Sequence, residues 1–125
     1  MNYKKNYLQY FYLLIALLGA SLTWLSNIEF MQIYGFNFNI KLFINLANDN
    51  PASESLSRDL FFTSIAIIVW MYSEVKRLDI KRFWLVLSST FIVAIAFSLP
   101  LFLFLRERRL IELKEKINPE VSIFN

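Results

Sequence analysis

Three long uncharged runs dominate the pattern of hydrophobic and polar positions along the chain. They extend over residues 7–26, 60–73 and 83–105, and charged residues stand close to both ends of each run. A helix that crosses a bilayer needs about 20 predominantly apolar residues. The pattern therefore predicts an all-α membrane protein with three transmembrane helices over about residues 7–26, 57–76 and 83–105.

The middle run is the shortest of the three, and its length predicts where the flanking charges lie. Residues 60–73 give only about 21 Å of helix, against a hydrocarbon core of about 30 Å. Asp59 and Glu74 are therefore expected at the edges of the apolar region. Helical spacing places one set of mostly polar residues on a single face: Asp59, Thr63, Ala66, Trp70, Ser73, Glu74 and Arg77. We name these positions the polar stripe.

The polar stripe is expected to contact partner helices, because an unpaired carboxylate in lipid is unfavourable by about 2.5 kcal/mol or more. The opposite face of the same helix is apolar and is expected to face lipid; it holds Leu60, Phe61, Ile65, Ile68 and Met71.

The segments between and after the runs predict smaller elements. Residues 36–48 pass from alternating to helical spacing, with Lys41 and several Asn on the polar side, which indicates a helix lying in the membrane interface. Asn50-Pro51 is typical of a helix start, with Asn50 as its cap. Residues 1–112 thus form a single three-span domain. Residues 113–125 are expected to be an amphipathic tail that becomes loose after Asn118-Pro119.

Two details concern the outer helices. The first run is longer than the 7–15 apolar residues of a secretory signal, so a retained helix is favoured over a cleaved one. Its strip of small residues, which includes Ala16 and Gly19, would allow close helix contact, although such residues are also simply tolerated there. In the last run, Pro100 lacks a backbone donor and is expected to kink the helix near Ala96.

An up-down-up arrangement of three helices predicts which charges meet. It places Asp59 level with Arg106 and Arg109, so we expect an Asp59–Arg106 ion pair at one membrane face. At the other face Glu74 can pair with Arg77, three residues away, or with Arg82. The alternative is that all of these charges are independent anchors at the interface.

Composition narrows the chemistry. The chain has 57% hydrophobic and 18% aromatic residues, which is far from the usual soluble mixture. It has no Cys and no His, which excludes disulfides, thiol catalysis, zinc sites of the usual kinds and His-ligated haem. With only two glycines it cannot form a glycine-rich phosphate loop, and no cofactor is expected. The net charge of +3 is modest and nucleic acid is an unfavoured partner.

The distribution of Lys and Arg leaves the orientation open in a three-span arrangement. The side of the amino terminus would hold six of them: Lys4, Lys5, Lys76, Arg77, Lys81 and Arg82. The other side would hold seven: Lys41, Arg58, Arg106, Arg108, Arg109, Lys114 and Lys116. Giving more weight to the short basic turn predicts a cytoplasmic amino terminus.

Several motifs together resemble the bacterial membrane family catalogued as domain of unknown function 2834. They are the Ser73-Glu-Val-Lys-Arg77-Leu turn, the Leu99-Pro-Leu-Phe-Leu-Phe-Leu-Arg-Glu-Arg108 ending and the acidic Asp59 that opens the middle helix. The resemblance covers roughly residues 7–109. It implies a three-span membrane fold, found in cyanobacteria and other bacteria, and no known activity. It also implies that the family keeps Asp59, Glu74, Arg77, Pro100, Arg106 and Arg108, without assigning them a role.

The sequence favours a small structural or accessory subunit of a membrane assembly, in a bacterial plasma membrane or thylakoid. Its partners would be the lipid bilayer and other membrane proteins or further copies of itself. An oligomeric transporter or channel lined by the polar stripe is an alternative. A membrane enzyme acting on a lipid or isoprenoid is less favoured, because Asp59 and Glu74 are about 22 Å apart along one helix and cannot act on one bond.

Overall fold

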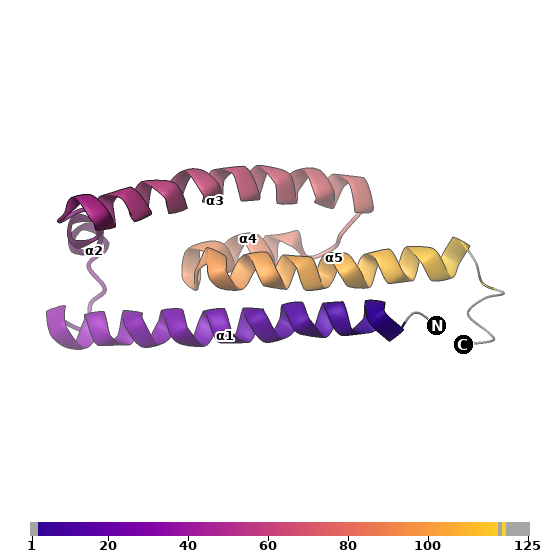
Figure 1. Ribbon diagram of the computed structural model, residues 1–125, viewed down its shortest axis with the longest axis horizontal. Coiled ribbons are helices and arrows are strands. Elements are labelled where there is room, and N and C mark those ends of the chain that lie inside the picture. Colours follow the sequence, from indigo (N-terminus) through magenta and orange to yellow (C-terminus); the bar gives the residue numbers. More distant parts are fainter. Residues whose placement is uncertain (1–2, 118, 120–125) are drawn as a thin grey trace.

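The computed structural model describes residues 3–117 and 119, and these contain five helices and no strand (Figure 1). The helices are α1 (Tyr3–Tyr34), α2 (Ile40–Ala47), α3 (Pro51–Leu78), α4 (Phe83–Ile92) and α5 (Ile95–Ile117). The expected all-α fold is confirmed. The expectation of a loose tail falls on residues 118 and 120–125, which lie outside the described residues.

The ends of α1 and α3 follow from local chemistry. Gly35 ends α1 with a φ of 112°, a conformation that glycine adopts without strain, and its N–H donates to the Met31 carbonyl at 2.9 Å. Asn50 begins α3, and its side-chain oxygen accepts hydrogen bonds from the N–H groups of Ala52 and Ser53 at 3.1 and 3.0 Å. The predicted Asn50 cap is confirmed, and α3 continues from Pro51 without a break through the residues of the expected second span.

The segment expected to be helical at residues 36–48 forms the short helix α2, which Asn39 caps. A cluster of aromatic side chains packs α2 against the end of α1. Neighbouring rings in this cluster have centroids 4.9–5.4 Å apart. The cluster consists of Phe30 and Tyr34 of α1, Phe38 of the connection and Phe43 of α2.

The single helix expected over residues 83–105 is instead two helices, α4 and α5, that form an antiparallel hairpin (Figure 1). The rings of Phe83 and Phe102 are 6.3 Å apart. In one straight helix their 19-residue separation would place them roughly 28 Å apart. A single helix over residues 83–105 is therefore wrong, and three transmembrane helices are not confirmed. Among the described helices, one is long and apolar enough to cross a membrane, over Tyr7–Tyr34.

The hairpin turns at residues 93–94 without glycine or proline. Before the turn, the hydroxyls of Ser89 and Thr90 donate to the Val86 carbonyl at 2.7 and 3.1 Å, and such bonds compete with regular helical pairing. Val93 and Ala94 then both donate their N–H to the Ser89 carbonyl, at 2.9 and 3.2 Å. The chain thus reverses before Pro100, which lies buried inside α5, and not through a proline kink near Ala96.

In space, α5 lies between α1 and α3 (Figure 1). The start of α1, the end of α3 from residue 74, the turn at residues 79–82 and the second half of α5, residues 106–117, share one end of the molecule, which we name the basic end. The end of α1, α2 and the start of α3 form the opposite, far end. Because of the hairpin, α5 carries its charges back to the end from which α4 starts.

The core lies where α3 meets the hairpin. Phe102 of α5 is fully buried, and its ring meets Trp70 of α3 at 5.5 Å and Phe83 of α4. The buried apolar residues of this core are Met71, Leu78, Ile80, Val86 and Phe102.

The face through which α3 packs is only partly the expected one. Met71, expected to face lipid, is fully buried, whereas the polar-stripe residues Asp59 and Thr63 are exposed. The second half of the stripe does meet a partner helix, because Trp70 and Glu74 contact α5.

A close helix contact joins α1 to α5 through the strip of small residues. Ala16 is fully buried, and a Cβ added to Gly19 would overlap the carbonyl oxygen of Ala96. In a regular helix that oxygen would accept from residue 100, but Pro100 has no N–H to donate. The oxygen instead faces the Cα of Gly19, an arrangement in which C–H groups contribute weakly at helix interfaces.

Replacing Gly19 with Ile is expected to weaken the α1–α5 contact, because the added atoms overlap backbone that cannot rotate away. Overpacking of this kind destabilises by about 1–3 kcal/mol. Thermal unfolding of the purified protein in detergent measures the effect. The matched control is Ser21→Ile at an exposed position of the same helix. Equal melting temperatures for the two variants would contradict the contact.

Candidate functional site

The carboxylate of Glu74, near the end of α3, binds two guanidinium groups. Its Oε1 accepts from Arg77 Nε at 2.7 Å, and its Oε2 accepts from Arg77 Nη2 at 2.9 Å. The same Oε2 accepts from Nε of Arg106 in α5 at 2.6 Å. Glu74 is only 8% exposed, so these partners compensate a nearly buried charge.

This arrangement connects two helices and leaves the carboxylate fully engaged. Arg77 comes from the same helix as Glu74, whereas Arg106 is 32 residues further along the chain. With both oxygens occupied by cations, Glu74 is poorly suited to act as a general acid or base.

A second arginine of α5, Arg109, holds the turn between α3 and α4. Arg109 Nε donates to the backbone carbonyl of Leu78 at 2.9 Å, and its Nη1 lies 3.2 Å from Glu112. Its Nη2 lies 3.8 Å from Asp79, which ends α3 in the left-handed conformation with a φ of 51°. No sequence pattern indicates this contact, because a helix end accepts any cation that tertiary structure brings to its carbonyls.

The structure brings together two of the expected partners and separates two others. Glu74 and Arg77 form the pair that their spacing suggested. The expected Asp59–Arg106 pair is wrong, because the hairpin carries Arg106 to the basic end while Asp59 lies toward the far end. Within the part of the chain that the structure describes, Asp59 pairs with neither Arg106 nor Arg109, and its neighbour Arg58 pairs with Glu54.

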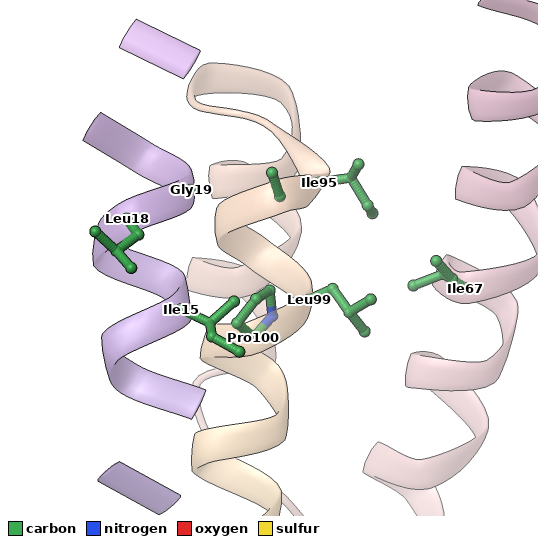
Figure 2. A pocket seen from close by; sticks show the side chains of 8 residues that line it. Ile15, Leu18, Gly19, Ile67, Ile95, Leu99 and Pro100 are labelled. Carbon is green, nitrogen blue, oxygen red and sulfur yellow. The ribbon is translucent and has the colours of Figure 1, made fainter. Parts of the chain in front are cut away.

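A cavity of about 380 Å³ lies beside the tip of the hairpin, between α1 and α3 (Figure 2). We name it the tip cavity. Figure 2 shows Ile67 of α3 and Leu99 of α5 pointing toward each other, with Ile15 of α1 beside Pro100. Its lining is almost wholly hydrocarbon and consists of Ile15, Leu18, Gly19, Ile67, Ile95, Ala96, Leu99 and Pro100.

Neither the tip cavity nor the ion pairs form a metal centre. Among the described residues, no group of three or more His, Cys, Asp or Glu side chains could hold a metal ion. Ser98 has a buried hydroxyl without a hydrogen-bond partner among these residues, but it does not line the tip cavity. The cavity can therefore hold an apolar group, and the basic end can bind anions.

Comparison with known proteins identifies a family whose model matches most of the chain. The family model described as Protein of unknown function DUF2834 matches residues 11–108, which include α2, α3 and α4 entirely and most of α1. No curated protein and no solved structure matches the chain.

The Glu74–Arg106 pair is expected to couple energetically across the two helices. In a double-mutant cycle of Glu74→Gln and Arg106→Gln, each single change leaves a poorly solvated charge, so the coupling energy should be at least about 1 kcal/mol. The matched cycle of Asp59→Asn with Arg106→Gln should be additive within about 0.5 kcal/mol. Denaturant unfolding in detergent measures both. Strong coupling to Asp59 with none to Glu74 would contradict the hairpin.

Proposed function

The chain belongs to the DUF2834 family, whose description assigns no activity, and from its structure we propose that it is an integral membrane protein serving as a structural or accessory subunit of a membrane assembly. The observation that carries this proposal is the polar stripe of α3, most of which no part of the described chain covers. The argument proceeds from membrane placement to orientation and then to the partner.

The exposed surface supports placement in lipid. Leu17 and Leu22 of α1 and Phe61, Phe62 and Val69 of α3 each have more than half of their surface exposed. Soluble monomers rarely present contiguous apolar patches of such extent. A bilayer would cover this surface, as it would for the one helix that is long and apolar enough to span it.

In the proposed placement, α1 and α3 cross the membrane and the α4–α5 hairpin enters from the basic end and turns near the middle. The 10 residues of α4 give about 15 Å of helix, which is half of the hydrocarbon core. Part of the turn backbone is paired within the hairpin, which membrane depth favours: the Ala94 carbonyl accepts from the N–H groups of Phe97 and Ser98, both at 3.1 Å. Ala96 faces Gly19, close to the middle of the uncharged run of α1.

The hairpin supports one orientation over the other. With α5 folded back, eleven of the thirteen Lys and Arg positions belong to the basic end, and only Lys41 and Arg58 belong to the far end. Because cytoplasmic segments are enriched in Lys and Arg, we place the basic end in the cytoplasm. The start of α1 and the end of α5 then lie on the same side of the membrane.

The polar stripe then requires an external partner. Asp59, Thr63 and Ser73 are exposed on a helix whose surroundings are otherwise apolar. Polar groups between membrane helices are stabilised by hydrogen bonds from a neighbouring helix. A helix of another subunit that offers such groups would satisfy the stripe. An oligomeric transporter is the second candidate, because the same stripe could line a pore between copies.

Orientation is tested by single cysteines, for which the chain is suited because it has none of its own. In intact bacterial cells, a membrane-impermeant maleimide should label Asn48→Cys at the far end. Lys81→Cys and Arg108→Cys, at the basic end, should be labelled only after lysis. A three-span arrangement instead predicts that Arg108→Cys is labelled together with Asn48→Cys, and that result would overturn the hairpin placement.

The partner is tested by a photoreactive amino acid placed at Ala66, within the stripe, and at Phe61 as the control on the opposite, exposed face of the same helix. In native membranes, Ala66 should give one protein adduct of defined mass and Phe61 should give lipid adducts only. An adduct with another protein supports the accessory subunit. An adduct of twice the chain mass supports the transporter, and lipid adducts from both positions contradict both candidates.

A further inference from the structure

We infer that the basic end and the tip cavity together bind one anionic phospholipid of the cytoplasmic leaflet, with its headgroup on the basic end and the end of one acyl chain in the cavity. The inference rests on the membrane placement proposed above, and not on the role as a subunit. It is carried by the charge of the basic end, the apolar lining of the tip cavity and the distance between them.

The headgroup half of the site is a surplus of exposed cations. Among residues with described side chains, nine Lys and Arg at the basic end face five Asp and Glu. The Arg77 side chain is 60% exposed although one edge of it binds Glu74, and Lys81 and Arg82 are exposed on the turn. Lys and Arg near the cytoplasmic surface attract anionic headgroups, and Arg pairs well with phosphate.

An exposed tryptophan indicates that the basic end lies at the depth of the lipid headgroups. Trp84 is 67% exposed and follows the basic turn within two residues of Arg82. Tryptophan is enriched at the level of lipid headgroups, where its ring contacts chains and its N–H contacts water. The turn therefore lies where a phosphate group would be.

The distance from this level to the tip cavity matches one leaflet. Along α3, Ile67 of the cavity is nine residues from Lys76, and along α5, Pro100 is nine residues from Arg109. Each separation corresponds to about 14 Å of helix, close to half of the hydrocarbon core. A chain whose headgroup lies on the basic end therefore reaches the cavity with its last carbons.

The tip cavity matches the end of an acyl chain and offers no partner to a polar group. Its volume of about 380 Å³ falls in the range of small-molecule sites, and hydrocarbon side chains line it. A neutral isoprenoid would also match the lining, but it would make no use of the cations above. The charge of the basic end therefore favours a phospholipid.

The test compares defined lipids on the purified full chain in mild detergent, read by thermal unfolding and native mass spectrometry. Phosphatidylglycerol with two sixteen-carbon chains should raise the melting temperature by about 4 °C or more and remain bound as one molecule. Phosphatidylcholine with the same chains, and phosphatidylglycerol with six-carbon chains, should give less than half of that shift. Equal shifts from all three lipids, or a larger shift from a neutral isoprenoid, would overturn the inference.

Paired variants separate the two halves of the site. Ile67→Trp fills the cavity and should abolish the preference for long chains, whereas Ile65→Trp, at an exposed position of the same helix, should retain it. The double change Lys81→Gln with Arg82→Gln should remove the preference for phosphatidylglycerol, and Lys41→Gln at the far end should not. If Ile67→Trp fails to fold, the chain-length series decides the cavity half.

These outcomes are distinguishable from failure of the proposed subunit. Lipid adducts alone at Ala66 would refute a protein partner and leave the lipid site intact. Labelling of Arg108→Cys together with Asn48→Cys would remove the placement on which the lipid site depends.

Discussion

The fold depends on one nearly buried carboxylate. Glu74 can be excluded from water only because Arg77 and Arg106 compensate its charge, and Arg106 has to come from a different helix. That requirement holds the second half of α5 against the end of α3. Since the uncharged part of α5 precedes Arg106, the chain between residues 83 and 105 has to return to the side from which it started. The hairpin, the basic end and the exposure of the polar stripe all follow from this connection.

Much of the fold could be predicted from local patterns. The three apolar runs indicated helices, Asn50 indicated a cap, and the spacing of Glu74 and Arg77 indicated a pair. The reversal at residues 93–94 could not be predicted, because 23 uncharged residues without a central glycine also satisfy a straight span. Only contacts between distant residues, such as Phe83 with Phe102, decide between the two. The wrong Asp59–Arg106 pair followed from that same choice.

The tip of the hairpin links packing to the candidate lipid site. Pro100 leaves the Ala96 carbonyl without its helical donor, and Gly19 permits that oxygen to approach α1 closely. These same residues contribute to the tip cavity on the side that faces α3. Because the hairpin stops near the middle of α1, no helix of the described chain lies between α1 and α3 in their halves toward the far end. The close contact and the uncovered surfaces therefore have a common origin.

The folded-back hairpin also simplifies how this chain enters a membrane. In the proposed orientation, the segment between the uncharged runs of α1 and α3, residues 27–59, is carried across, and Lys41 and Arg58 are its only Lys and Arg residues. The arginines of α5 stay on the side where they are synthesised, so the insertion machinery never has to desolvate them. Insertion thus reduces to passing this one segment, after which α4 and α5 can enter together as a preformed unit.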